Sequence, residues 1–358
     1  MDRATVEVYE RRAQEWLDRR PLSDEETDRA LSFAARVAPG ADRIDLGCGP
    51  GRHTEFLGEP LLSLDAAHAM LVLNRSRHPG LRPVQADLSR LPIRRKALSG
   101  GWAICAYQHL PAEEFPMALA ELHWALAVGS PVTVVVHAGE GQGHRTDDDF
   151  PGRFFSHWSA GRLTDLFTGA GFEDIRVEQS GRNRGSLCLT ASRALSLPDT
   201  VAPGMRLLVC GLNPSVYAAE AGVGYARPSN RFWAAAGAAG LVDHLRDPAA
   251  ALRQHAIGMT DLVKRATARS AELSRDEYRA GAERVRRLVE WLEPQAVCFV
   301  GLEGYRAAVD ARASIGWQPT PFGGRPAYVM PSTSGLNARS RPHDLADHLR
   351  AAAAGPGV

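Results

Sequence analysis

Short apolar runs alternate with amphipathic stretches along the first half of the chain. The apolar runs lie in RIDLG, PLLSLD, LRPVQAD, GWAICAY and PVTVVVH. In the first amphipathic stretch, Ser23 followed by Glu26 predicts a helix-capping box, and Gly40 can end that helix. Apolar residues recur on one face between these points, at Ala30, Phe33, Ala34 and Val37. This alternation predicts a parallel α/β sheet with helices on both faces, as in Rossmann-like domains.

The same pattern restarts near residue 204. MRLLVCGLNP predicts a strand that runs into a loop, and QAVCFVG and RPAYVMPSTSG predict further strands. Between them Ser274 and Glu277 predict a second capping box, followed by an apolar stripe that runs from Tyr278 to Leu292. We therefore expect a second, smaller α/β domain with a central parallel sheet.

A connecting segment separates the two patterns. Residues 193–204 hold two prolines and a glycine and show no clear period, which is typical of a linker. We therefore predict a first domain over residues 1–195, a linker over 196–203 and a second domain over 204–350. A chain of 358 residues is long enough for two domains of this size.

Composition narrows the class of protein. Hydrophobic residues make up 44% and charged residues 23%, which predicts a packed globular protein. No apolar run is long enough to cross a bilayer, and the charged N-terminal stretch does not resemble a signal peptide. Five dispersed cysteines without a CxxC pair favour reduced thiols over a zinc site or disulfides. We therefore expect a cytoplasmic protein that binds neither metal nor membrane.

Charge is distributed unevenly between the halves. Residues 1–198 hold 23 basic and 26 acidic residues, whereas residues 199–358 hold 19 basic and 15 acidic residues. The basic excess lies where a nucleic-acid surface would be needed, although four charges are a weak signal. Because the chain has only two lysines, Lys96 and Lys264, phosphate contacts would be made mainly by arginines and backbone amides.

A glycine-rich loop follows the first predicted strand, in the sequence DLGCGPG. Its glycines allow a tight turn close to a ligand, and the next predicted helix would offer free backbone amides; they are Gly47, Gly49 and Gly51. Asp65 ends the next strand, where a carboxylate can accept both hydroxyls of a ribose, and Asp87 ends the third strand. Such loops also bind dinucleotides, and a similar turn can occur in a Rossmann-like domain that binds nothing.

The GxGxG spacing, with Asp45 two residues ahead, resembles the class I S-adenosylmethionine-dependent methyltransferases over about residues 30–195. The resemblance implies S-adenosylmethionine as cofactor, with Asp45 and the glycines at its methionine part. It likewise places Asp65 at the ribose and Asp87 at the adenine amino group. The methyl acceptor stays open, because neither an NPPY-type motif nor a Pro-Cys pair is present. His109 is a candidate base, but a lone histidine after a strand more often packs or lines a pocket.

Four blocks in the second half point to a second site. GLNPS (211–215) and MPSTSGLN (330–337) each follow a predicted strand, so these loops can face one crevice at the carboxyl ends of a parallel sheet. YARPSNRFW (225–233) and GMTDLVKRAT (258–267) lie between them. Together and in this order, the blocks resemble the mismatch-specific uracil/thymine-DNA glycosylases over about residues 203–350.

This second resemblance implies roles for individual residues. Asn213 would position the hydrolytic water, and Tyr225 would stack on the flipped base. Backbone amides between Ser332 and Gly335, including Ser334, would bind DNA and pocket groups. Leu336 would be the wedge in the base stack, and Arg339 and Arg341 would meet phosphates. Three positions depart from the family pattern: Ser215 replaces a glycine, Ala218 a serine, and Asp261 a lysine or asparagine.

These observations leave three functional hypotheses open. In the first, the protein excises uracil or a related base, such as one in a G·U or G·T mismatch, and also transfers a methyl group to an unidentified acceptor. In the second, the C-terminal domain binds uracil or mismatched DNA without cutting it and is attached to a small-molecule methyltransferase; the three departures favour this reading, and the retained Asn213 opposes it. In a third reading the methyltransferase half is a structural appendage, which the intact DLGCGPG opposes.

Overall fold

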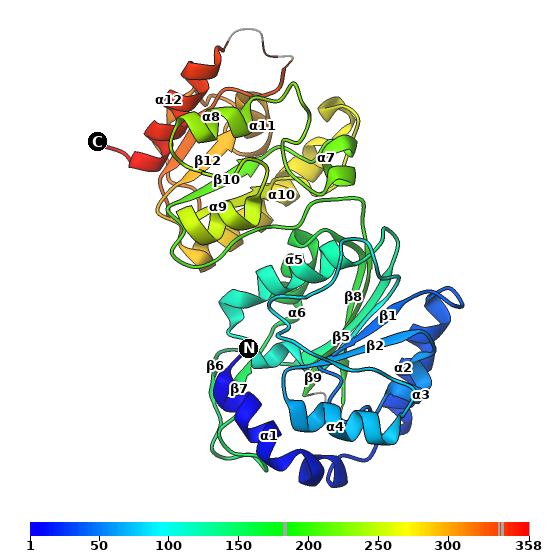
Figure 1. Ribbon diagram of the computed structural model, residues 1–358. Helices are drawn as coiled ribbons and strands as arrows, with labels where there is room; N and C mark the ends of the chain where they lie inside the picture. Colours follow the sequence, from blue (N-terminus) through cyan, green and yellow to red (C-terminus); the bar gives the residue numbers. More distant parts are fainter. Residues whose placement is uncertain (182–184, 336, 338–339, 358) are drawn as a thin grey trace. The chain divides into compact units, whose positions relative to one another are not determined.

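The computed structural model describes residues 1–181, 185–335, 337 and 340–357 (Figure 1). The chain divides into two compact units. The first comprises Met1–Thr168 with Phe172–Ala194, and the second Gly169–Gly171 with Leu195–Val358. We call them the N-terminal unit and the C-terminal unit and describe each separately.

A seven-stranded sheet forms the centre of the N-terminal unit, in the order β3-β2-β1-β4-β5-β9-β8. The strands are β1 (Arg43–Leu46), β2 (Leu61–Asp65), β3 (Val84–Gln85), β4 (Gly101–Ile104), β5 (Pro131–His137), β8 (Phe172–Ser180) and β9 (Ser186–Arg193). The first five are parallel, as predicted, but β9 runs antiparallel to both β5 and β8. Only residues 181–185 separate β8 from β9, and parallel pairing needs a much longer crossover, so this hairpin departs from a purely parallel sheet.

Helices cover both faces of this sheet (Figure 1). They are α1 (Arg3–Asp18), α2 (Asp24–Arg36), α3 (Thr54–Leu57), α4 (His68–Arg77), α5 (Phe115–Ala125) and α6 (Ala160–Gly169), with a small added sheet of β6 (Gln142–His144) and β7 (Phe154–Ser156). The predicted capping box of α2 is confirmed, because Ser23 and Glu26 each accept a hydrogen bond from the other's backbone amide. This helix ends at Arg36, four residues before Gly40.

The C-terminal unit is built on a five-stranded sheet in the order β11-β10-β12-β14-β13. The strands are β10 (Leu207–Gly211), β11 (Ile257–Asp261), β12 (Val297–Val300), β13 (Gly316–Trp317) and β14 (Ala327–Met330). Four are parallel, and β13 is an antiparallel edge strand. Because β10 and β11 are neighbouring parallel strands, the loops that leave their carboxyl ends emerge at the same sheet edge.

Six α-helices accompany this sheet in the described part of the chain. They are α7 (Val216–Ala221), α8 (Phe232–Ala238), α9 (Pro248–His255), α10 (Arg275–Leu292), α11 (Leu302–Ala308) and α12 (Pro342–Ala354). The capping box predicted for α10 is confirmed between Ser274 and Glu277, and the predicted apolar stripe is buried. Within the described residues, no helix is both long and apolar enough to cross a membrane, and no group of histidine, cysteine or acidic side chains has the arrangement of a metal site.

The segment expected to be a linker packs into the C-terminal unit. Six of its residues are buried: Ser196, Leu197, Pro198, Asp199, Thr200 and Val201. The backbone of Thr200 pairs with Met259 of β11, and the Asp199 carboxylate accepts hydrogen bonds from Lys264 Nζ at 2.8 Å and from Arg284 at 2.6 Å. A segment without hydrophobic periodicity can therefore still contribute core residues and buried ion pairs, because isolated β-bridges and buried charges leave no periodic pattern in the sequence.

Candidate functional sites

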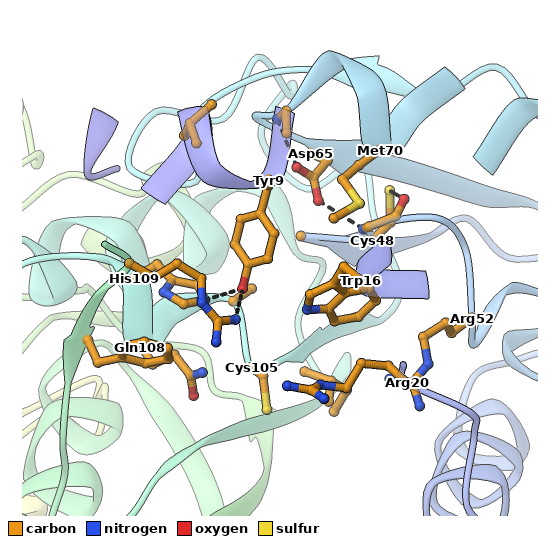
Figure 2. A pocket seen from close by; sticks show the side chains of 18 of the residues that line it. Tyr9, Trp16, Arg20, Cys48, Arg52, Asp65, Met70, Cys105, Gln108 and His109 are labelled. Atoms are coloured by element: carbon orange, nitrogen blue, oxygen red, sulfur yellow. Dashed lines mark hydrogen bonds between the residues drawn. The ribbon is translucent and has the colours of Figure 1, made fainter. Parts of the chain in front are cut away.

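A cavity of about 390 Å³ opens at the carboxyl ends of β1, β2 and β4 in the N-terminal unit (Figure 2). Among the residues that line it are four predicted ones: Asp45, Gly47, Gly49 and Asp65. The cavity therefore lies where the glycine-rich loop was expected to meet a ligand.

The glycine-rich loop is folded tightly against its surroundings. Gly47 and Gly49 have φ angles of +67° and +51°, and a Cβ added at Gly47 would overlap with Ala106 Cβ. Gly51 has a φ of +75° but does not line the cavity; its added Cβ would lie 2.8 Å from Asn74 Nδ2 on α4. Gly47 and Gly49 thus bring the backbone close to the cavity, whereas Gly51 allows the loop to pack on a helix.

Asp45 is a buried polar group in this wall with an unpaired oxygen atom. Its side chain is 2% exposed, and its Oδ2 atom has no hydrogen-bond partner among the described residues. Burial, together with the nearby charge of Asp65, raises the pKa of Asp45 to about 8. A buried carboxylate oxygen without a donor favours a cationic or N–H ligand group beside it.

The two other predicted acids differ in position. Asp65 lines the cavity, and its carboxylate accepts hydrogen bonds from the backbone amides of Gly49 at 2.8 Å and Ala67 at 2.9 Å. Asp87 does not line the cavity and accepts hydrogen bonds from Ser89 and from the Met1 ammonium group at 2.6 Å. The structure therefore brings Asp45 and Asp65 together at the cavity and leaves Asp87 behind its wall.

Helix α1 covers part of the cavity, a feature that the sequence reasoning missed. Figure 2 shows Tyr9 of α1 beside His109 in the cavity, with Trp16 of the same helix on the other side of Tyr9. The Nδ1 atom of His109 lies 2.7 Å from the Phe154 carbonyl oxygen and must carry a hydrogen, so Nε2 accepts the Tyr9 hydroxyl at 2.9 Å. Arg153 in turn donates to the Tyr9 oxygen at 3.0 Å.

Burial decides the charge state of His109, and the hydrogen-bond chain engages both of its ring nitrogens. Burial is the main cause that lowers the pKa of His109 to about 3, so its ring is neutral and both nitrogens are engaged. His109 therefore packs and lines the cavity instead of standing free as a base. The signal that could have located α1 was its row of apolar and aromatic residues, Val6, Tyr9 and Trp16, on a charged helix.

In the C-terminal unit, Asn213 lies in the loop after β10 with its amide group fixed. Its Nδ2 atom donates to the Arg265 carbonyl oxygen at 2.9 Å, to Thr267 Oγ1 at 2.8 Å and to the Pro214 carbonyl oxygen at 3.1 Å. A carbonyl oxygen can only accept, so the nitrogen must face this group. The Oδ1 atom, for which the described residues offer no hydrogen bond, is left to accept one from a ligand or water.

Tyr225 adopts an unusual backbone conformation in the second block. Its φ angle is +58°, a region that non-glycine residues seldom occupy. Its ring stacks on Phe232, with centroids 4.2 Å apart and planes inclined by 21°. The hydroxyl oxygen is buried and lacks a hydrogen-bond partner in the described part of the chain. One ring face is therefore covered, so a base could stack only on the other.

The loop after β14 is organised by Arg231, a residue that the sequence reasoning did not single out. Its guanidinium donates to the carbonyl oxygens of Ser334 at 3.0 Å and Asn337 at 2.6 Å, and to that of Ser340. A Cβ added at Gly335 would lie 2.8 Å from Ser229 Cβ, so this loop packs closely on the second block. All of these acceptors are neutral, so the cation adds positive charge to the loop.

Some of the other residues predicted in this loop can be placed in the structure, and others lie outside the described residues. Ser332 Oγ accepts a hydrogen bond from the Ser334 amide at 3.3 Å. The Arg341 amide donates to Asp344 Oδ2 at 2.7 Å at the start of α12. Leu336 and Arg339, the expected wedge and one expected phosphate contact, lie outside the described residues.

The three departures from the family pattern have identifiable places. Ser215 caps α7, with Oγ accepting the Ala218 amide at 3.2 Å, and Ala218 is buried in a small apolar cluster. Asp261 ends β11 directly opposite Gly211 of β10. Ser215 thus serves helix capping and Ala218 serves packing, whereas Asp261 lies at the end of β11 beside the Asn213 loop.

Models of known protein families match parts of both units. Residues 44–129 match the family model for a methyltransferase domain, and residues 198–353 match that for the uracil DNA glycosylase superfamily. The chain joins a methyltransferase domain to a uracil DNA glycosylase superfamily domain. The methyltransferase match contains the glycine-rich loop, and the glycosylase-superfamily match contains all four C-terminal blocks. A methyltransferase domain, a uracil DNA glycosylase superfamily domain and the expected α/β fold class are thus confirmed, and the mismatch-specific type of the second domain stays a prediction.

Solved structures similar to this chain include several methyltransferases. A SAM-dependent methyltransferase from Methanosarcina mazei is 16% identical, covering 46% of this chain and 97% of that one, with a TM-score of 0.41. One from Thermotoga maritima, described as a possible histamine N-methyltransferase, is 15% identical over 53% and 99%, with a TM-score of 0.42. The Burkholderia thailandensis 1,6-didemethyltoxoflavin-N1-methyltransferase is 20% identical over 53% and 85%, with a TM-score of 0.41.

Proposed function

We propose that the methyltransferase domain binds S-adenosylmethionine in the cavity and transfers its methyl group. The observation that carries this proposal is Asp45, which lines a cavity built on the glycine-rich loop and whose buried Oδ2 has no hydrogen-bond partner among the described residues. The cofactor's α-amino group is an ammonium, and its ribose offers two hydroxyls. Asp45 fits the first, and Asp65 has lone pairs left for the second, since a carboxylate can accept about four hydrogen bonds.

In this proposal, the residues of the chain bind and orient the cofactor. When bound, the cofactor supplies an electrophilic methyl group on a sulfonium centre. Asp45 and the loop amides hold its charged end, and α1 with Tyr9 and Trp16 excludes water from the cavity. Because Tyr9, His109 and Arg153 are bonded to one another, they give shape to the wall and supply no free base. The aromatic wall favours a small, flat acceptor that is nucleophilic without deprotonation by the protein.

Isothermal titration calorimetry of the full chain with S-adenosylmethionine tests the binding. We expect one site per chain, weakened by Asp45→Asn and unaffected by Asp42→Asn, a matched change at an exposed acid three residues away. Absence of heat and of any thermal stabilisation by the cofactor in the wild-type protein would contradict the proposal.

We propose that the glycosylase-superfamily domain hydrolyses the bond between a flipped base and its sugar in DNA, with uracil as the reference base. The observation that supports it is the fixed orientation of Asn213, which directs Oδ1 away from its anchors Arg265 and Thr267. An amide oxygen held in this way accepts a hydrogen from water and orients the water oxygen. It is too weak a base to remove the proton, so the reaction would depend on the departure of the base.

Incubation with duplexes carrying G·U, A·U or G·T, and with single-stranded uracil DNA, tests the excision. Alkali cleavage reveals the abasic sites. We expect release from at least one uracil substrate. Tight binding to uracil DNA with no abasic sites at high protein concentration would instead support a domain that binds damaged DNA without cutting it.

A further inference from the structure

One polar part of the N-terminal cavity is not used by the proposed cofactor contacts. In Figure 2, Gln108 lies on the opposite side of Tyr9 from Asp65, the residue proposed to hold the ribose. We propose that this part of the cavity is the methyl-acceptor site, and that Gln108 and His137 bind a neutral, flat nitrogen heterocycle there by donating hydrogen bonds to it. The inference rests on the proposed methyltransferase function and names its acceptor class.

Two neighbouring parallel strands carry these two side chains. Strand β5 ends at His137, and Gln108 lies in the one-turn helix Tyr107–His109 that follows β4. Because β4 pairs in parallel with both β5 and β1, their carboxyl ends open at the same edge of the sheet as the glycine-rich loop. Both side chains line the cavity, and Gln108 is only 2% exposed.

The hydrogen bonds of Gln108 determine which donors are left for a ligand. Its Oε1 atom accepts the backbone amide of His137 at 3.1 Å, and its Nε2 atom lies 3.3 Å from His137 Nε2. An amide nitrogen can only donate, so His137 Nε2 accepts and Nδ1 of the neutral ring carries the hydrogen. Within the part of the chain that the structure describes, neither this hydrogen nor the second hydrogen of Gln108 Nε2 has an acceptor. The cavity wall therefore offers two N–H donors.

The charges of this wall are already balanced. Each arginine that lines the cavity has a carboxylate oxygen within 3.2 Å: Arg20 pairs with Asp149, Arg52 with Glu26, Arg145 with Asp147, and Arg153 with Asp148. An anionic acceptor would compete with these carboxylates for the arginines, and a cationic acceptor would compete with the arginines for the carboxylates. The pairing therefore favours an acceptor without net charge.

The histidine, tyrosine and cysteine side chains nearby are poor bases. Burial is the main cause that lowers the pKa of His109 to about 3 and that of His137 to about 4. Burial also raises the pKa of Tyr9 to about 12 and that of Cys105 to about 11, so both keep their protons near neutral pH. A phenol or thiol acceptor has to lose a proton before it attacks, and these groups do not remove it efficiently.

A ring nitrogen can attack without such a base. Its lone pair forms the bond to the methyl carbon, while the bond from that carbon to sulfur breaks and leaves its electron pair on sulfur. The positive charge passes to the ring, which spreads it over several atoms, and any hydrogen on the attacking nitrogen leaves as a proton to solvent. A second nitrogen or a carbonyl oxygen on the ring can accept from Gln108 or His137, which orients the attacking atom.

Isothermal titration calorimetry of the full chain saturated with S-adenosylhomocysteine, which has no methyl group to transfer, measures acceptor binding. The probes are benzimidazole, quinazoline and adenine, with benzoate as a flat anion. We expect at least one heterocycle to bind and benzoate not to bind. Gln108→Met keeps the side-chain length but removes both polar atoms, and it should weaken heterocycle binding about three- to tenfold, the range of a neutral hydrogen bond.

Two further variants complete the series. Gln108→Glu keeps an oxygen for the His137 amide but loses the donor, so it should weaken heterocycle binding at least as much as Gln108→Met. Gln179→Met, at an exposed glutamine of β8, is the control and should follow wild type. Affinity for S-adenosylhomocysteine and thermal unfolding check that each variant is folded. As a second measurement, labelled methyl from S-adenosylmethionine should appear on the heterocycle that binds and not on catechol, a phenol of similar size.

Several results would show that the inference is wrong while cofactor binding stands. They are binding of benzoate, labelling of catechol, no binding of any heterocycle up to its solubility limit, and wild-type heterocycle affinity in both folded Gln108 variants. If neither S-adenosylmethionine nor S-adenosylhomocysteine binds the wild-type protein, the proposed methyltransferase function fails and the inference fails with it.

Discussion

Replacing Asp45 by asparagine distinguishes two effects of this residue. One is the free-energy cost of burying its negative charge, and the other is its contribution to cofactor affinity. Its pKa is raised from 3.8 to about 8, so the folded state holds the proton more tightly than the unfolded chain. The stability contributed by this group is therefore complete below about pH 4, falls as pH rises and levels off above about pH 8. Each pKa unit corresponds to about 1.4 kcal/mol, so wild type should lose roughly 3 kcal/mol from this group between pH 5 and pH 7.

Asp45→Asn removes this pH-dependent loss of stability. Relative to wild type, the variant without ligand should become more stable by up to about 3 kcal/mol on going from pH 5 to pH 7, because asparagine does not ionise. Its affinity for S-adenosylmethionine should nevertheless fall by roughly ten- to a hundredfold, the value of a charge-assisted hydrogen bond.

Thermal unfolding of the full chain at both pH values, with and without S-adenosylmethionine, measures the two effects together. The transition that shifts with the cofactor identifies the N-terminal unit. Asp42→Asn is the control and should change neither quantity. A stability difference between Asp45→Asn and wild type that is the same at pH 5 and pH 7, combined with unchanged affinity, would refute this reasoning.

Two further predictions concern the C-terminal unit. Thr267→Val removes one anchor of the Asn213 amide and should slow base release about three- to tenfold, whereas Thr267→Ser should retain the wild-type rate; equal rates for the two variants would show that the anchor has no role. Arg231→Met removes the donor to three loop carbonyls and should weaken duplex binding at least tenfold in gel-shift titrations, with cofactor binding by the N-terminal unit unchanged; wild-type DNA affinity in a folded variant would contradict this.

Local signals in the sequence were sufficient for much of the fold. Both capping boxes, at Ser23 and Ser274, were predicted because their hydrogen bonds join residues three apart. The glycine-rich loop was predicted because its turn needs φ angles that only glycine adopts readily. The antiparallel β9 was not predicted, because its pairing with β5 depends on contacts between distant segments.

The loops of the two sites could be predicted from the sequence, whereas side chains that reach these sites from distant segments could not. Asn213 and Asp45 lie in short motifs beside strands and could be identified from the sequence. The roles of Tyr9 and Arg231 could not, since each contacts a segment about 100 residues away: Tyr9 bonds to His109, and Arg231 bonds to the loop after β14. The close approach of the Asp261 and Tyr225 side chains to Gly211 likewise appears only in the folded chain, where β10 and β11 lie side by side.

Single-turnover base release by wild type and Asn213→Ala on one G·U duplex tests the proposed excision most directly. We predict that wild type produces alkali-sensitive abasic sites and that Asn213→Ala produces none above background. The variant should bind the uracil duplex with affinity within a few-fold of wild type, since Asn213 serves the water and contacts no phosphate in this proposal. Base release by Asn213→Ala at the wild-type rate, or none by the folded wild-type protein, would contradict it.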